Sequence, residues 1–197
     1  STFPQRRSFD IPREWRDLSG SNLVQRLDLT PSLDAGFPFL SPLAKLLTER
    51  IENRIAGYAR DAGFLQMEFP SVVRAELVER TGVLESFQKE MMRLGGDRSG
   101  LILSPTTEEP LLAYLESAGI ASYRDLPVRV FHFNDVFRWI PRARGSYSSR
   151  EIHTCIFAHL AVDLNQFQDG MERFDHLCCS LWSDLRIPTR ILRSGDH

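Results

Sequence analysis

The segment from Leu126 to Val162 constrains the fold more than any other part of the chain. Apolar residues lead from Val128 into Phe137, and in a second run every other position from Ile152 to Val162 is apolar except Thr154. Because side chains alternate between the two faces of a strand, this spacing predicts two strands, each with an apolar face. The polar residues between them are typical of a loop. The segment therefore predicts a hairpin of two long strands.

Arginines lie at both ends of this loop and within it. Arg138 follows the first strand, Arg150 precedes the second, and Arg142 and Arg144 lie between them. A guanidinium group presents several donors in one plane, which suits phosphate or carboxylate. A hairpin with a solvated basic tip would show the same pattern. The residues of the hairpin alone favour this second interpretation.

Three further motifs flank or belong to the hairpin in a fixed order. They are Ser-Pro-Thr-Thr-Glu-Glu at Ser104 to Glu109, Ser122 to Arg129, and Phe137-Arg138 followed by Arg150-Glu151. Together they resemble the central part of a class II aminoacyl-tRNA synthetase. The prolyl enzymes are the most similar, followed by the seryl and threonyl enzymes. Several ordered motifs are more specific than any one of them alone.

The resemblance extends from about Gly36 to Arg193. It implies an α/β (α+β) fold in which an antiparallel sheet is flanked by helices. We expect residues 1–40 to be an N-terminal segment that wraps the surface, because prolines interrupt it. Residues 41–197 are expected to form the class II synthetase-like domain. This domain ends before motif 3, which in the family is a glycine-rich strand and helix whose arginine binds the γ-phosphate of ATP.

Local patterns predict the elements of this domain. Ser41-Pro42 is typical of a helix start, and an apolar stripe predicts a helix as far as Gly63. The remaining expectations are a strand at Phe64 to Phe69, a helix at Pro70 to Leu94, a strand at Leu101 to Leu103, a helix at Leu164 to Leu185 and a strand at Ile187 to Leu192. In the class II synthetases that this chain resembles, a helix and strand of this kind form motif 1, which makes much of the dimer interface. The resemblance therefore implies a homodimer.

Thr106 and Glu108 are candidate substrate-binding residues. Acidic residues here also suit a helix N-terminus, because they complement the helix dipole. In prolyl and seryl synthetases a Thr-x-Glu sequence at this place holds the ammonium group of the amino acid. Spacing alone does not separate the two interpretations, and the resemblance favours substrate binding.

Arg138 matches the arginine of motif 2, which implies contact with the α-phosphate of ATP and the carboxylate of the amino acid. A guanidinium group already in place would stabilise charge that develops on the phosphate. The resemblance also implies Mg²⁺ and a nucleotide-binding role for Arg150. Three positions depart from the family: Ile140 replaces a glutamate, Ile152 an aromatic residue that stacks on adenine, and Ile156 an acidic metal ligand. The departures predict weak ATP binding and impaired catalysis.

Composition limits the other possibilities. The 197 residues carry a formal net charge of −2, so bulk charge does not bind this chain to nucleic acid. Three cysteines, two of them adjacent, favour a reduced setting, either cytoplasm or an organellar matrix. No apolar run approaches the length of a membrane span. The cysteines and histidines match no closed metal site, so we predict no metal ligands.

Three functions follow as hypotheses. The first is activation of an amino acid of the proline, serine or threonine type with ATP, for transfer to tRNA. The second is a non-catalytic paralogue that acts in dimerisation or in binding RNA or protein. The third is a ligase that charges a carrier protein. For this chain, the second is favoured over unaided catalysis.

Overall fold

A computed structural model shows how the predicted hairpin is built into the fold. It describes residues 22, 24, 26–27, 29–30, 32–34, 36–79, 89–95, 100–117, 120, 122–143 and 148–190. Arg144, most of the N-terminal segment, the middle of the helix predicted from Pro70 and the end of the last predicted strand lie outside the described residues. In the described part of the chain, no helix combines the length and the apolar character needed to cross a membrane.

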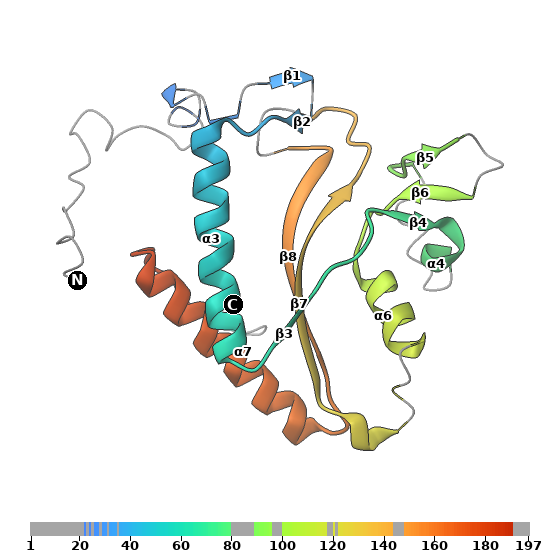
Figure 1. Ribbon diagram of the computed structural model, residues 1–197, viewed down its shortest axis with the longest axis vertical. Coiled ribbons are helices and arrows are strands. Elements are labelled where there is room, and N and C mark those ends of the chain that lie inside the picture. Colours follow the sequence, from blue (N-terminus) through green and yellow to red (C-terminus); the bar gives the residue numbers. More distant parts are fainter. Residues whose placement is uncertain are drawn as a thin grey trace.

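The hairpin forms the centre of a three-stranded sheet (Figure 1). Strand β7 (Val128–Phe137) pairs antiparallel with β8 (Glu151–Leu160), in a register that joins Val128 to Leu160 and Phe137 to Glu151. On the other side of β7 lies β3 (Leu65–Met67), which runs parallel to it. The long antiparallel pair is therefore confirmed, while the short third strand makes the sheet mixed.

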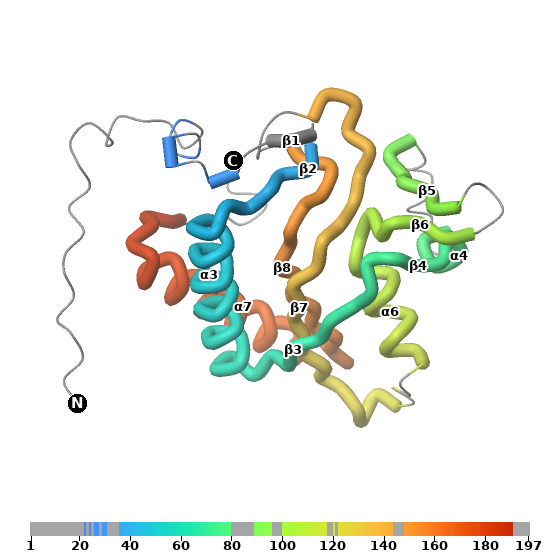
Figure 2. Tube along the Cα trace, turned by 45° about the horizontal axis from the view of Figure 1, so that its top comes forward, coloured from blue at the N-terminus to red at the C-terminus, as the bar shows by residue number. Residues whose placement is uncertain are grey.

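Two long helices cover one face of this sheet (Figure 2). Helix α3 (Pro42–Asp61) begins with Ser41, whose Oγ accepts a hydrogen bond from the Ala44 backbone N–H at 3.3 Å. Helix α7 (Leu164–Asp184) is capped in the same way by Asp163. Both predicted helices are confirmed. The core between helices and sheet contains Ala56, Ala59, Phe64, Phe131 and Leu177.

Helix α7 approaches strand β8 closely at Gly170. A Cβ atom on Gly170 would lie 2.2 Å from Cδ2 and 2.4 Å from Nε2 of His159. The same His159 Nε2 lies 2.8 Å from the backbone oxygen of Gln166, one turn earlier in α7. Glycine at position 170 thus allows the histidine ring to pack directly against the helix.

Helix α6 (Glu108–Ser117) lies on the opposite face of the central sheet. Its Leu111 and Leu115 pack with Val130 of β7, and Ala158 and Leu160 of β8 lie against the same cluster. A 3-10 helix (Tyr123–Asp125) follows it and leads into β7. One face of the hairpin therefore packs against α3 and α7, and the other face packs against α6.

A second, smaller sheet lies beside α6, in the order β4-β6-β5. Its strands are β4 (Val72–Arg74), β5 (Arg93–Leu94) and β6 (Leu101–Leu103), and helix α4 (Ala75–Glu79) follows β4. The last two described strands, β1 (Ser32–Asp34) and β2 (Phe37–Pro38), pair with each other at the end of the hairpin where its loop lies (Figure 1). The strand at Leu101 to Leu103 is confirmed.

Two expectations about local structure were wrong. The helix predicted over Pro70 to Leu94 begins and ends in strands, because β4 and β5 both pair with β6 and local periodicity does not register that pairing. The strand predicted from Ile187 is also absent in the described residues 187–190. There the Ile187 N–H donates to the Trp182 carbonyl at 2.8 Å, so it terminates α7.

Candidate functional site

Arg138 lies where the end of β7 meets the loop before α6. Its Nε donates to the Pro105 carbonyl at 3.0 Å, and its backbone N–H donates to the Arg150 carbonyl at 2.9 Å. One residue earlier, the Phe137 N–H donates to the Ser104 carbonyl at 2.9 Å. These bonds hold the Arg138 guanidinium group beside the loop that carries the predicted substrate-binding residues.

The loop places Thr106 and Glu108 at the start of α6. Thr106 is buried, and its hydroxyl donates to the carboxylate of Glu109. Glu108 is exposed, and one of its carboxylate oxygens accepts from the Thr107 N–H at 3.0 Å. Sequence reasoning gave Glu109 no binding role, although it is 5% exposed and fixes the Thr106 side chain. The Thr-x-x-Glu spacing at a helix start was the signal that could have indicated this contact.

His132 lies behind Glu108 on the α6 face of β7. The imidazole is fully buried, with the Phe69 ring edge-on at 5.0 Å between centroids. Burial lowers the pKa of His132, while the neighbouring Asn134 side chain and the Glu108 carboxylate offset part of that effect. Glu108 begins α6, which packs on this face of the sheet, and Pro105, three residues before Glu108, accepts the bond from Arg138. The structure thus brings Thr106, Glu108 and Arg138 into one region.

Several polar atoms of this region have no hydrogen-bond partner in the described part of the chain. They are both ring nitrogens of His132, Oδ1 of Asn134 and the hydroxyl of Thr107; the Asn134 side chain lies close enough to His132 to raise its pKa, but the geometry is not that of a hydrogen bond. Asn134 is anchored at its other end, because Nδ2 donates to the Phe69 carbonyl at 2.7 Å. Buried polar atoms are usually paired, but Arg129 Nε and His159 Nδ1 on the α3 and α7 face also lack a partner among the described residues, so the feature peculiar to this layer is that both ring nitrogens of one histidine are unpaired.

The strand register decides which residues of β8 face this region. Ile152, Thr154 and Ile156 pair with Val136, Asn134 and His132, while Cys155 and Phe157 pack into the core under α3 and α7. These three side chains of β8 therefore share the face that carries His132 and Asn134. These side chains offer neither an aromatic ring nor a carboxylate, so they do not fit an adenine ring or a magnesium ion. In the described ranges, no three His, Cys, Asp or Glu side chains are grouped so that they could hold a metal ion.

Arg150 lies across the hairpin from Arg138, and its side chain turns toward Trp139. The guanidinium carbon is 3.9 Å from the centroid of the Trp139 ring, and Nε donates to the Ile140 carbonyl at 3.1 Å. Both contacts join Arg150, at the end of the hairpin loop, to residues at its start. The predicted contact of Arg150 with phosphate stays a prediction.

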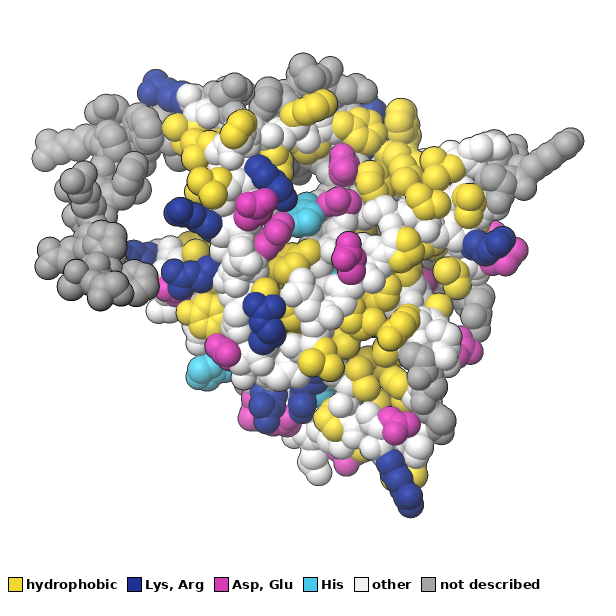
Figure 3. Space-filling model, in the orientation of Figure 1, with side chains coloured by type: hydrophobic (Ala, Val, Ile, Leu, Met, Phe, Trp, Pro, Cys, Tyr) yellow, Lys and Arg dark blue, Asp and Glu magenta, His cyan; other side chains and the backbone are white. Residues whose placement is uncertain are grey.

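A separate charged cluster lies on the α3 side of the hairpin. His153 Nδ1 is 2.6 Å from Asp135 Oδ1, and His153 Nε2 is 2.8 Å from Glu52 Oε1. These three residues, Lys45 and Glu151 line a cavity of about 390 Å³. Figure 3 shows acidic side chains gathered around a histidine in a hollow of this face. Burial and then the nearby Asp135 raise the pKa of Glu151, which His153 partly offsets.

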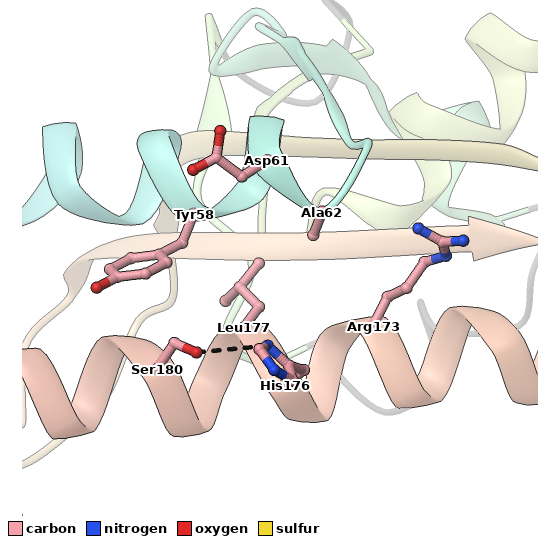
Figure 4. A pocket seen from close by; sticks show the side chains of 7 residues that line it. All are labelled: Tyr58, Asp61, Ala62, Arg173, His176, Leu177 and Ser180. Atoms are coloured by element: carbon pink, nitrogen blue, oxygen red, sulfur yellow. Dashed lines mark hydrogen bonds between the residues drawn. The ribbon is translucent and has the colours of Figure 1, made fainter.

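Another cavity, of about 460 Å³, lies between α3 and α7 (Figure 4). Its polar lining comes from Tyr58 and Asp61 of α3 and from Arg173, His176 and Ser180 of α7. Arg173 is already bonded to Asp169 at 2.9 Å, and this hydrogen bond lowers the pKa of Asp169. None of the predicted site residues lines this cavity, and it lies on the α3 and α7 side of the sheet.

Comparison with known proteins supplies relatives for most of the chain, although no protein-family model matches it. The proline-tRNA ligase of Fusobacterium nucleatum subsp. nucleatum is 31% identical over 144 residues, which are 72% of this chain and 25% of that protein. The threonine-tRNA ligase of Haloarcula marismortui is 33% identical over 135 residues, which are 68% of this chain and 21% of that protein. The chain thus spans about a quarter of the length of the curated relatives it matches.

Solved structures show the same fold. The prolyl-tRNA synthetase of Giardia lamblia, in complex with prolyl-adenylate, matches with a TM-score of 0.74 and 17% identity, over 83% of this chain and 35% of that chain. The RNA binding domain of threonyl-tRNA synthetase from Cryptosporidium parvum Iowa II matches with a TM-score of 0.76 and 17% identity, over 83% and 42% of the two chains. Over about 70% of its length the chain is therefore homologous to prolyl- and threonyl-tRNA ligases, and its fold is that of class II aminoacyl-tRNA synthetase domains.

Proposed function

We propose that this synthetase-like chain binds a free amino acid of the proline, serine or threonine type between Arg138 and the start of α6. One observation carries the proposal: Arg138 Nε is bonded to the Pro105 carbonyl at 3.0 Å, directly before Thr106. This bond holds a cation beside the Thr106–Glu108 turn, whose carboxylate is exposed. A zwitterion presents one charge for each of these groups.

Each predicted residue has a distinct part in the proposed site. The Arg138 guanidinium would accept the carboxylate of the ligand through charge-assisted hydrogen bonds, and Glu108 would accept from its ammonium group. The Thr106 hydroxyl donates to Glu109, which leaves its oxygen lone pairs to accept from the same ammonium group. Glu109 would act through Thr106 by fixing its rotamer.

Activation of the amino acid with ATP is less well supported by this chain. The resemblance implies ATP and Mg²⁺, and the Giardia lamblia relative was solved with prolyl-adenylate. Here Ile152 and Ile156 face the site where the family has a stacking ring and a metal ligand. Stacking on an aromatic ring contributes about 1–3 kcal/mol per base where it has been measured. We therefore propose that the chain by itself binds an amino acid and forms adenylate poorly. Transfer to tRNA or to a carrier protein stays a prediction, as does the cytoplasmic or organellar setting.

Calorimetry on the full chain tests the amino-acid site. L-proline, L-serine and L-threonine are titrated into the wild type and into Glu108→Ala and Arg138→Ala. We expect at least one amino acid to bind, and each substitution to weaken it by about tenfold or more, because each removes one charged partner. Arg142→Ala, an exposed arginine of the same hairpin loop, is the matched control and should bind as the wild type does. Equal affinities in all four proteins would overturn the assignment.

Pyrophosphate exchange tests the impaired activation. It should stay at background for the wild-type chain, and measurable exchange would refute impaired activation.

Helix α3 supports a second proposal, that the chain forms a homodimer. Its N-terminal half exposes Leu43, Leu46, Leu47 and Ile51, each between 41% and 47% accessible, at helical spacing. A contiguous apolar stripe of this kind is typical of an interaction surface. We expect the wild type to sediment as a dimer and Leu47→Glu to sediment as a monomer. A wild type that is monomeric at high concentration would exclude this proposal.

A further inference from the structure

The turn between β1 and β2 contacts the end of the segment that joins β7 to β8, and it lies close to Ala143 in the middle of that segment. We propose that Gly36, Arg150 and Trp139 form a latch that fixes the two ends of this segment and thereby orients Arg138. In this proposal, Arg150 is a positioning residue and does not contact a ligand. The effect on ligand binding rests on the proposed function, whereas the latch itself does not.

Gly36 forms one side of the latch. Its backbone has φ +86°, a conformation that favours glycine, and its carbonyl accepts from the N–H groups of Arg150 at 2.7 Å and Glu151 at 3.2 Å. A Cβ atom here would lie 2.7 Å from Arg150 Cγ and 2.7 Å from Ala143 Cβ. Only a residue without a side chain can approach Arg150 and Ala143 this closely.

Arg150 forms the centre of the latch. Its guanidinium group lies 3.9 Å from the Trp139 ring centroid, and its Nε is bonded to the Ile140 carbonyl at 3.1 Å. A cation over an indole face is attracted by the ring quadrupole, and a planar guanidinium group stacks there with little loss of other hydrogen bonds. One side chain therefore connects the start of β8 with the two residues that follow Arg138.

The latch reaches Arg138 through the main chain. The Arg150 carbonyl accepts from the Arg138 N–H at 2.9 Å, which extends the ladder of the hairpin by one pair. On the far side, the Trp139 N–H donates to the Glu90 carbonyl at 2.6 Å. Hydrogen bonds to Arg150 on one side and to Glu90 on the other thus hold the backbone of Arg138 and Trp139. The Arg138 side chain can then meet Pro105 and a ligand carboxylate without first being ordered, which favours binding.

Trp139 provides a direct report on the latch, because its side chain is 47% exposed. A background of Trp15→Phe and Trp182→Phe leaves Trp139 as the single tryptophan of the chain. In this background we compare acrylamide quenching and amino-acid affinity in Arg150→Ala, Arg150→Lys and Gly36→Ala, with Arg142→Ala as the control. Circular dichroism verifies that each variant is folded.

We expect Arg150→Ala and Gly36→Ala each to increase quenching of Trp139 and to weaken amino-acid binding by about tenfold, because a small displacement of Arg138 weakens its contacts. Arg150→Lys keeps the charge but loses the planar stack, so it should resemble Arg150→Ala. Arg142→Ala should change neither quantity. If Gly36→Ala does not fold, Trp139→Leu replaces it, and combining it with Arg150→Ala should weaken binding no further than either change alone.

Two results would overturn the latch. Unchanged quenching in both Arg150→Ala and Gly36→Ala would show that Arg150 does not order Trp139. Weaker binding in Arg150→Ala, with Arg150→Lys restored to wild-type affinity and quenching unchanged, would identify Arg150 as a ligand contact. Absence of amino-acid binding in the wild type would refute the proposed function, and quenching would still decide the latch.

Discussion

The two faces of the β7–β8 hairpin differ in how they treat polar side chains. On the α3 and α7 face, His153 lies between Asp135 and Glu52, and Arg129 is bonded to Asp169 at 2.6 Å. On the α6 face, neither ring nitrogen of the fully buried His132 has a hydrogen-bond partner among the described residues. The polar side chains of the first face connect strands and helices even where one of their atoms, Arg129 Nε or His159 Nδ1, has no partner in the described ranges, whereas the His132 ring makes no such connection.

If the proposed amino-acid site lies on the α6 face, that face should contribute less to stability than the α3 and α7 face. Polar groups that stabilise a fold are paired, because an unpaired buried donor or acceptor is unfavourable. A ligand or an ordered water can supply the partner of an unpaired group, and one such group, the Thr107 hydroxyl, lies between Thr106 and Glu108 in the sequence. Three substitutions test whether the two faces divide in this way.

Phe131→Ala should have the largest effect, on the α3 and α7 face. Phe131 is fully buried and stacks on Phe157 at 5.7 Å between centroids. Its truncation leaves a cavity in the core, so the free energy of unfolding should fall by about 3–5 kcal/mol. Urea denaturation measures this loss. Leu65→Ala, at a side chain that is 71% exposed, is the control and should change stability little. A loss for Phe131→Ala no larger than that of the control would contradict the division.

Gly170→Ala should have an intermediate effect on the same face. The added methyl group would meet the His159 ring at distances of 2.2 to 2.6 Å, so ring and helix must separate. We expect the free energy of unfolding to fall by about 1–3 kcal/mol. Gly57→Ala in α3 is the matched control, because its added Cβ meets nothing within 4 Å. That change should stabilise the chain by about 0.5–1 kcal/mol. Equal effects of the two substitutions would show that α7 is not closely packed at Gly170.

His132→Phe should have the smallest effect, although His132 is as buried as Phe131. The phenyl ring removes two unpaired nitrogens and keeps a ring against Phe69, so stability should stay within about 1 kcal/mol of the wild type or rise. His159→Phe is the control on the other face, where the Gln166 carbonyl would lose its partner and stability should fall. A large loss for His132→Phe would show that the imidazole is structurally paired.

The same variant predicts a change in pH dependence. Burial lowers the pKa of His132, so below the ordinary histidine pKa of about 6.5 the unfolded chain binds a proton that the folded chain does not. The wild type therefore loses this part of its stability as the pH falls, and His132→Phe does not. Urea unfolding at about pH 7.5 and about pH 5.5 should give a smaller decrease for the variant. Parallel decreases would show that His132 is not held neutral by burial.

Local sequence patterns predicted some elements well and others badly. Helices α3 and α7 and strands β7 and β8 were predictable, because each has a long apolar period and the helices have capping residues at their starts. Strands β4 and β5 were not, since each is short and is stabilised by pairing with β6. The candidate site residues Thr106, Glu108 and Arg138 came from the resemblance. It did not indicate the burial of His132 or the stack of Arg150 on Trp139.

By itself, the sequence determined the periodicity of the central hairpin, the caps of its covering helices and the charged residue types at Arg138 and Glu108, because these depend on neighbours along the chain. Only the tertiary structure decided which face of the hairpin each residue occupies, that Pro105 holds Arg138, and that Gly36 reaches Arg150. These contacts join segments distant in sequence. They form only when the packing of α3, α6 and α7 brings those segments together, and no local pattern encodes that arrangement.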